Sequence, residues 1–320
     1  MRWKLWALTV IAVLVAAACG GSGQSSGSKQ LTIGIDNGSG SGFPYPSAIA
    51  QGIVDKANKV GVKVVANLDG KNDPQREASN VQDLVSQHPD GILLLPADAA
   101  AAAHLADQVA AANIKVMSVH SVVGANRKIT DVYPKLNALV IENEVGAGTQ
   151  AAQLVKKAFP SGAKIAVVLG QAGYAEDQLR LEGFQQVLSG SEYPIVAQQP
   201  GDWTATKGQS ACANMLAAHP DIQVFYNESD DMGTGCAQAV QSAGSKAKVI
   251  GVGGSKLGIQ DIKSGQMYGT ICYKPYTEGQ IAMQEMYQIL TGKANDHAKL
   301  VYYETPTITA ENVDQCSPQW

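Results

Sequence analysis

The chain has 320 residues, of which 45% are hydrophobic and 16% are charged. This composition is typical of a globular protein and excludes an intrinsically disordered chain, and the length allows two domains of about 100–200 residues. The formal net charge is −4, from 24 basic and 28 acidic side chains. No surplus of positive charge is available to neutralise phosphates, so the composition argues against nucleic acid as a partner.

The N-terminus predicts a secretory signal peptide over residues 1–18. A basic head, Met1-Arg2-Trp3-Lys4, precedes an apolar run that is shorter than the about 20 residues a membrane-spanning helix needs. The end of this run, Leu14-Val15-Ala16-Ala17-Ala18-Cys19, resembles a bacterial lipobox, with alanine where lipoproteins more often carry leucine. We therefore expect Cys19 to be lipidated. The alternative is ordinary cleavage after the three alanines, with an incidental cysteine.

Residues 19–30 are rich in glycine and serine and predict a flexible tether. A lipid on Cys19 followed by such a tether would hold a folded domain off a membrane. We expect an exported protein anchored to the outer face of the cytoplasmic membrane, in the periplasm or at the cell surface.

From Leu31 onward, short apolar runs alternate with longer amphipathic ones. The continuous, β-branched runs are typical of strands that are covered on both faces. The predicted strands are Leu31–Asp36, Lys63–Leu68, Gly91–Pro96, Lys115–His120, Lys164–Gly170, Ile195–Gln199, Gln223–Asn227, Lys248–Val252 and Gly269–Tyr273. The predicted helices are Ser47–Val60, Pro74–Gln87, Ala99–Ala112, Val145–Ala158, Ala175–Leu188, Thr204–Ala218, Met232–Ala243, Leu257–Ser264 and Tyr276–Leu290. Asp73, Asp98 and Asp231 precede or begin helices and are predicted helix caps.

The repeated strand–helix order predicts an α/β protein with parallel sheets and right-handed crossovers. Nine such units are too many for one sheet at this length, and the irregular stretch Val122–Leu139 interrupts them near the middle. We therefore predict two doubly wound lobes with a cleft between them. Ligands of such sheets lie outside the carboxyl ends of the strands, so the residues at those ends are the candidates for a binding site.

Four cysteines follow the tether, and an even number in an exported protein predicts two disulfides with three possible pairings. Cys212 and Cys236 lie on successive predicted helices, whereas Cys272 and Cys316 lie near strands at the end of the chain. These positions favour the pairs 212–236 and 272–316. A zinc site is the weaker alternative, because no pair of cysteines or histidines has ligand spacing.

The strand ends carry no motif for a cofactor, a metal or a catalytic nucleophile. The glycine-rich turn at residues 38–42 lacks the GxGxxG spacing of a dinucleotide-binding loop, and neither GxxxxGK[ST] nor GxSxG occurs. His120 lies at a strand end beside Ser121, but no orienting acid can be assigned to the pair. We interpret His120 as a hydrogen-bonding ligand contact and expect no cofactor, no metal and no enzymatic activity.

Aromatic side chains beside neutral polar groups are what the strand ends do offer. Phe43 and Tyr45 follow the first strand, Trp203 follows the sixth, and Tyr273 ends the ninth. Sugars and polyols need this mixture, because their C–H faces stack on rings while each hydroxyl donates and accepts hydrogen bonds. The candidate polar partners are Asn37, His120, Ser121, Gln178, Ser229 and Asp230. Structural roles, as packed loop anchors or as part of a hinge core, are the alternatives for the aromatic residues.

Several stretches between residues 31 and 305 resemble the ribose-binding-protein type of periplasmic binding proteins, which supply ATP-driven sugar importers. They are Gly52-Ile-Val-Asp-Lys-Ala-Asn-Lys-Val-Gly61, Asn80-Val-Gln-Asp-Leu84, Gly91-Ile-Leu-Leu-Leu-Pro96, Ala111-Ala-Asn-Ile114, Leu181-Glu-Gly-Phe-Gln-Gln186, Ala217-Ala-His-Pro-Asp221 and Asp230-Asp-Met232. The resemblance implies two lobes joined by three crossover segments. An N-terminal lobe would span residues 31–141 and 274–302, and a C-terminal lobe residues 142–273 and 303–320. The lobes would close on a sugar, and the closed protein, a monomer, would be recognised by an ABC permease.

Carried residue by residue, the resemblance keeps the family's stacking aromatics at Tyr45 and Trp203. The asparagine before the first aromatic pair is Phe43 here, and the family's Asp-Arg pair after the fourth strand is His120-Ser121. A sugar-binding arginine falls on Gln178, while a second family arginine is retained as Arg180.

Further along, the Asn-Asp pair that the family carries at a strand end is Ser229 followed by the retained Asp230. The family's Phe-Asp pair at a later strand end is Val252-Gly253 here, and its final glutamine is Tyr273. These differences remove a carboxylate and an arginine that would grip sugar hydroxyls through charge-assisted bonds. We therefore expect a cleft that is rich in aromatics and low in charge, with an uncharged sugar or polyol other than ribose as its ligand.

Three other classes of protein remain to be weighed. A sugar-responsive repressor of this fold would carry a helix-turn-helix ahead of the body, where this chain has a signal and a tether, and is excluded. A secreted carbohydrate-active enzyme would use Asp230 or Asp231 as acid and His120 as base, but adjacent residues on one tip point apart. A sensor that presents the closed lobes to a membrane receptor is not separated from a transporter by the sequence.

Overall fold

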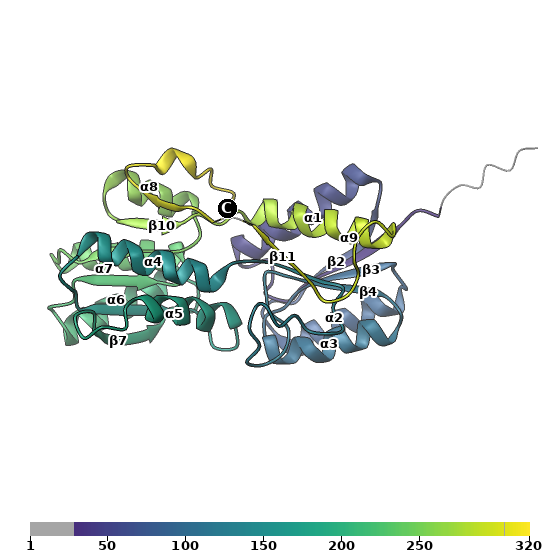
Figure 1. The fold of residues 1–320 in the computed structure, drawn as a ribbon, viewed down its shortest axis with the longest axis horizontal. Helices are drawn as coiled ribbons and strands as arrows, with labels where there is room; N and C mark the ends of the chain where they lie inside the picture. Colours follow the sequence, from purple (N-terminus) through teal and green to yellow (C-terminus); the bar gives the residue numbers. More distant parts are fainter. Residues whose placement is uncertain (1–28, 304) are drawn as a thin grey trace, which may run out of the picture.

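The computed structural model describes residues 29–303 and 305–320 as two α/β lobes (Figure 1). The predicted signal peptide, Cys19 and residues 19–28 of the predicted tether lie outside the described residues. Among the residues that the structure describes, no helix combines the length and the apolar character needed to cross a membrane.

The first lobe is built on a six-stranded, fully parallel sheet. The strand order is β11-β5-β4-β3-β1-β2, with β1 Thr32–Asn37, β2 Lys63–Asp69, β3 Gly91–Leu95, β4 Lys115–Val119, β5 Ala138–Glu142 and β11 Lys299–Tyr303. Helices α1 Pro44–Val60 and α9 Pro275–Leu290 contribute to the core on one face, and α2 Pro74–Ser86 and α3 Ala99–Ala111 to the core on the other.

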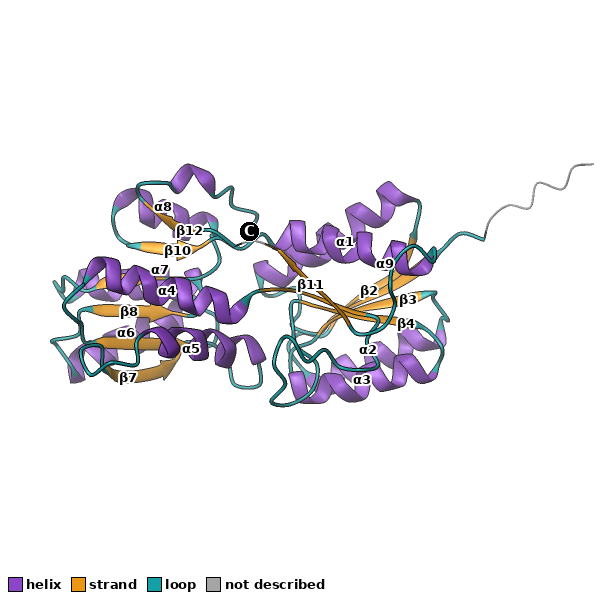
Figure 2. Cartoon of the chain, in the orientation of Figure 1, coloured by secondary structure: helices purple, strands orange, loops and turns teal. Residues whose placement is uncertain are grey.

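The second lobe repeats this architecture with one antiparallel edge strand, β12. The order is β12-β10-β9-β8-β6-β7, with β6 Ile165–Leu169, β7 Ile195–Pro200, β8 Val224–Asn227, β9 Lys248–Ile250, β10 Gly269–Ile271 and β12 Thr307–Thr309. One face is covered by α4 Glu144–Ala158 and α5 Ala175–Val187, and the other by α6 Ala205–Ala218, α7 Asp230–Ser242 and α8 Lys256–Ser264 (Figure 2). A short 3-10 helix, Val313–Gln315, follows β12.

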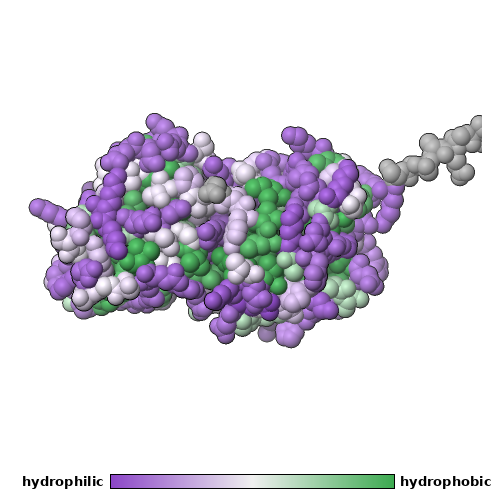
Figure 3. Space-filling view, viewed as in Figure 1, coloured by the Kyte–Doolittle hydropathy of each residue, from purple (hydrophilic) through white to green (hydrophobic). Residues whose placement is uncertain are grey.

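The chain passes between the lobes three times: after β5, between β10 and α9, and between β11 and β12. The doubly wound, two-sheet fold that the sequence predicts is therefore confirmed. Hydrophilic residues are spread over both lobes on the face shown in Figure 3, with hydrophobic residues between them.

All nine predicted strands are present, but three further strands were not predicted. The sequence predicts an irregular stretch up to Leu139, whereas β5 begins at Ala138 and is buried throughout. Because only Asn143 separates β5 from α4, no loop marks the end of this strand. β11 is half-exposed and β12 has three residues, so neither carries the continuous apolar run of a central strand.

Two of the three predicted helix caps are confirmed. The carboxylate of Asp73 accepts hydrogen bonds from the backbone N–H groups of Gln75 and Arg76, and that of Asp98 accepts one from Ala101. The prediction for Asp231 is wrong, because α7 begins at Asp230, two residues before the predicted start at Met232. The hydroxyl of Ser229 accepts the hydrogen bond from the Met232 N–H instead.

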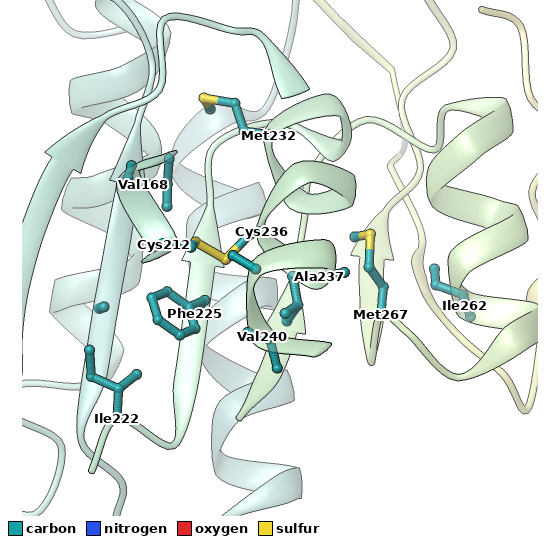
Figure 4. Packing of buried hydrophobic residues seen from close by; sticks show 14 of the residues in the cluster. Val168, Cys212, Ile222, Phe225, Met232, Cys236, Ala237, Val240, Ile262 and Met267 are labelled. Atoms are coloured by element: carbon teal, nitrogen blue, oxygen red, sulfur yellow. A yellow bond between two sulfur atoms is a disulfide. The ribbon is translucent and has the colours of Figure 1, made fainter. Parts of the chain in front are cut away.

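Both disulfides have the pairing that the cysteine positions favour. Cys212 on α6 is joined to Cys236 on α7 within the hydrophobic core of the second lobe (Figure 4). Cys272, which follows β10, is joined to Cys316 after the 3-10 helix. The second bridge fixes the end of the chain to the segment that leads from β10 into the hinge.

Replacing Cys212 and Cys236 together by alanine removes a cross-link between residues 24 apart in the sequence. We expect the free energy of unfolding to fall by about 2–4 kcal/mol, because the unfolded chain regains the freedom that the cross-link removes. Denaturant titration of the oxidised wild-type and variant proteins measures the change. An unchanged midpoint and slope would contradict a stabilising role for this bridge.

Candidate ligand-binding cleft

A cavity with about 670 Å³ of empty space, part of it open to solvent, lies between the two lobes. Its walls come from residues that follow strands of both sheets: Ser39 after β1, His120 after β4, Trp203 after β7, Glu228 after β8 and Gly253 after β9. Parallel strands all end at the same edge of a sheet, and in this molecule those two edges face each other across the cleft.

Direct contacts between the lobes close one side of the cleft. The Asn72 side-chain amide donates to Gln171 Oε1 at 2.8 Å, and the Tyr174 hydroxyl donates to Asn72 Oδ1 at 3.0 Å. The backbone N–H of Ala99 donates to the Gly173 carbonyl at 3.3 Å. The loop before α5 therefore rests on the first lobe, and the structure has its lobes together.

Seven of the eleven predicted ligand-binding residues line this cavity. They come from both lobes, from the ends of β4, β7 and β10 and from the starts of α1, α5 and α7. They are Phe43, Tyr45, His120, Arg180, Trp203, Ser229 and Tyr273.

Three other predicted contacts lie outside the cavity lining. Asn37 is buried and its side-chain oxygen accepts a hydrogen bond from the Gly40 N–H at 3.1 Å, so it shapes the turn after β1. Ser121 is 2% exposed and lies beneath the surface of the cleft. Gln178 is exposed on α5, two residues from the cavity-lining Arg180, and two residues along a helix point to different sides.

The prediction that Asp230 contacts the ligand is also corrected, because its side chain lies outside the cavity lining. Its carboxylate is buried and accepts hydrogen bonds from the Ser255 N–H at 2.8 Å and from the Thr270 hydroxyl at 2.6 Å. Asp230 therefore joins α7 to the start of α8 and to β10. The next residue, Asp231, lines the cavity instead.

The expectation of a cleft low in charge is wrong. Five glutamates, each at most 1% exposed, lie in or directly behind the cavity wall: Glu142, Glu144, Glu176, Glu228 and Glu278. None of the five is among the site residues that the sequence predicts. The available signal was their position at strand ends and in the first turns of the following helices, above all the Glu-Asn-Glu that follows the apolar run of β5.

Arg180 and Glu144 form a buried, two-pronged ion pair. Arg180 Nε donates to Glu144 Oε2 at 2.6 Å and its Nη2 donates to Oε1 at 2.9 Å, while its Nη1 donates to the Glu228 carbonyl at 2.8 Å. The Tyr273 hydroxyl also donates to Glu144. Burial lowers the pKa of Arg180, but the Glu144 charge outweighs it and the pKa stays well above the usual range. Arg180 therefore keeps its positive charge beside Glu144.

Close packing of α4 on α5 allows this pair to form. A Cβ on Gly148 would clash with the Arg180 carbonyl, and a Cβ on Gly183 would clash with the Val145 carbonyl. With glycine at both positions the two backbones approach closely, and the guanidinium from the second turn of α5 reaches the carboxylate at the start of α4.

His120 and Glu142 form a second ion pair next to the hinge. His120 Nδ1 lies 2.9 Å from Glu142 Oε2, and the hydroxyls of Tyr45 and Tyr303 donate to Oε1. Burial lowers the pKa of His120, but the charge of Glu142 dominates and brings it to about 9. Burial likewise raises the pKa of Glu142, but His120 lowers it to about 2. Near neutral pH the histidine carries a positive charge and the glutamate a negative one.

Among the described residues, His120, Glu142 and Glu278 are also close enough to hold a metal ion, with their ligand atoms within 4.8 Å of one another. Both oxygens of Glu142 already accept hydrogen bonds, from His120 on one side and from two tyrosines on the other. A metal would have to displace these donors, so the geometry favours the ion pair.

Aromatic rings form the remaining walls of the cleft. Trp203 meets Tyr174 edge to face at a centroid distance of 5.6 Å, and Tyr45 meets Trp320 in the same way at 5.2 Å. Gly170, at the end of β6, leaves the space that the Trp203 ring occupies, since a Cβ there would overlap the indole. Several ring faces are thus held rigidly around a cavity that also contains charged groups.

A family model described as a periplasmic binding protein domain matches residues 37–294. The chain belongs to the periplasmic binding protein family. It is 29% identical over 269 residues to the ribose import binding protein RbsB of Bacillus subtilis, covering 84% of this chain and 85% of the relative. It is 27% identical over 302 residues to the xylitol-binding protein of Mycolicibacterium smegmatis, covering 93% and 82% respectively.

Among solved structures, the myo-inositol-binding protein of Caulobacter, bound to myo-inositol, matches with a TM-score of 0.79 and 25% identity. The match covers 90% of this chain and 95% of that one. With the relatives above, it shows the ribose-binding-like, type I architecture within the family. The resemblance that the sequence suggests is confirmed.

Removing either member of the Arg180–Glu144 pair leaves a buried charge without its partner. We expect Arg180→Met or Glu144→Gln to lower the free energy of unfolding by about 3–5 kcal/mol, measured by denaturant titration. The double variant is the control. Because it contains neither charge, it should be less destabilised than the sum of the two single variants. Additive losses would show that the two side chains do not interact.

Proposed function

We propose that this protein is the extracytoplasmic solute-binding component of an ABC importer and that it captures a sugar or polyol in the cleft between its lobes. The observation that carries the proposal is the cleft itself. Its rings, Tyr45, Tyr174, Trp203 and Tyr273, come from both lobes and surround hydrogen-bonding groups. Such walls suit a compound with C–H faces and many hydroxyls. The relatives named for ribose and xylitol support this choice of ligand class.

The three interlobe crossings give the proposal its mechanism. A ligand that contacts both lobes binds the closed arrangement better than the open one, and so shifts the equilibrium toward closure. The closed protein would then be the form that a membrane permease recognises. No step of this cycle requires bond chemistry, which agrees with relatives that are named as binding proteins rather than enzymes.

Delivery to a permease requires the protein to be on the outer side of the cytoplasmic membrane. We propose export by the predicted signal peptide, lipidation at Cys19 and attachment through the Gly/Ser tether, with the folded part acting as a monomer. Mass spectrometry of the N-terminal peptide from membrane fractions tests the lipid, and a Cys19→Ser variant that stays in the membrane fraction would contradict the anchor.

Trp203→Ala removes one of the two indole rings that line the cleft, and we expect it to abolish ligand binding. A thermal-shift screen against sugars, polyols, nucleosides and amino acids first identifies a ligand. A ligand at a hundredfold excess over its dissociation constant adds about 2.7 kcal/mol to the stability of the native state. Tyr302→Ala is the control, because Tyr302 is 45% exposed and lies outside the cavity lining. Equal affinities of the wild type and Trp203→Ala would refute the cleft as the binding site.

A further inference from the structure

The cleft contains more buried negative charge than its own positive groups can neutralise. Of the cavity-lining residues that the structure describes, only His120 and Arg180 carry a positive charge. Each is already engaged, His120 with Glu142 at 2.9 Å and Arg180 with Glu144 at 2.6 Å. His120 also lies 3.7 Å from Glu278, whereas Glu176 and Glu228 form no ion pair with a described residue.

Two of these carboxylates, Glu176 and Glu228, line the cavity itself. Glu176 is 1% exposed in the first turn of α5, and Glu228 is fully buried after the end of β8. Neither oxygen of either side chain has a hydrogen-bond partner of normal geometry among the described residues, although the Ser121 hydroxyl lies close enough to Glu176 to lower the pKa of its carboxyl group. Most buried polar groups in folded proteins are paired, so four unpaired oxygens at one cavity indicate a missing partner.

The local environment makes these side chains costly to leave alone. Burial raises the pKa of both carboxyl groups above the usual range. A buried carboxylate without a counter-charge is destabilising, and it is either neutralised by a proton or paired with a cation. The protein supplies no free cation in the described part of the cleft, so a bound molecule is the remaining source.

The aromatic walls also suit a positive charge. The guanidinium carbon of Arg180 lies 5.1 Å from the Tyr273 ring centre and 5.9 Å from that of Trp203, so these rings already accommodate one cation. Ring faces attract cations most strongly where water is excluded. An ammonium group also has three N–H donors. Two carboxylates that lack partners can accept hydrogen bonds from them.

We propose that the ligand is a sugar or polyol that carries an ammonium group, and that Glu176 and Glu228 recognise this group. The inference rests on the proposed function, because it specifies the ligand class of the same cleft. It replaces the uncharged ligand that the sequence suggests with an amino sugar or an amino polyol.

Calorimetric titration at pH 7 with matched pairs tests the inference: glucosamine against glucose, galactosamine against galactose, and N-methylglucamine against sorbitol. We expect the amine of at least one pair to bind at least tenfold more tightly than its neutral counterpart. We expect Glu176→Gln or Glu228→Gln to reduce this preference at least tenfold, because glutamine keeps the shape and removes the charge. Glu182→Gln, an exposed position on the same helix α5, is the matched control and should leave the preference unchanged.

Each remaining outcome is decisive. If neutral compounds bind at least as tightly as the amines in every pair, the inference fails while the proposed function stands, and the carboxyl groups are protonated donors to hydroxyls. If an amine is preferred but both glutamine variants keep that preference, Glu176 and Glu228 are not the recognition groups and the inference fails. If neither class binds, the inference and the proposed sugar or polyol ligand fail together.

Discussion

Every feature of the cleft depends on the direction of the strands. In the described part of the chain, all strands except β12 run in one direction within their sheet. Each sheet therefore ends these strands at one edge, and the two edges face each other. A residue one to three positions beyond a strand can thereby reach the cavity from either sheet. His120, Trp203 and Glu228 are far apart in the sequence and reach one cavity for this reason. The second shared feature is the short connection from strand to helix, which places first-turn residues such as Glu144 and Glu176 there as well.

So many buried charged groups at the facing edges of the two sheets are stable only if they neutralise each other. The Arg180–Glu144 pair meets this requirement with several hydrogen bonds, and the glycines of α4 and α5 permit the close helix approach it needs. The His120–Glu142 pair meets it with two additional tyrosine donors. Buried pairs of this kind contribute little net stability compared with apolar packing, but they fix geometry. In this protein they fix the two walls of the cleft and leave Glu176 and Glu228 as the groups available to a ligand.

The sequence was a good guide to the sheets and to the aromatic walls, because both leave local signals. Buried parallel strands are continuous apolar runs. An aromatic residue just after such a run is therefore placed near the carboxyl ends of the strands. The charged part of the site left weaker signals. Glu176 and Arg180 are four residues apart and share one face of α5, whereas Gln178 points to solvent. The helical period therefore determines which of these side chains line the cleft, and a residue-by-residue match to a family does not contain this information. Glu142 was passed over because its strand, β5, has no loop to mark its end.

The closed arrangement itself bears on what the ligand must provide. Tyr174 and Gln171 of the second lobe contact Asn72 of the first, and Tyr45 of the first lobe packs on Trp320 and Tyr273. These contacts hold the lobes together around a cavity, partly open to solvent, in which Glu176 and Glu228 form no ion pair. In an open cleft, water would solvate both carboxylates, so closure without a ligand carries a desolvation cost that the few interlobe hydrogen bonds must offset. A ligand that pairs with these carboxylates removes that cost. The unpartnered carboxylates would therefore act as a check on closure, favouring the closed form only when a complementary molecule is inside.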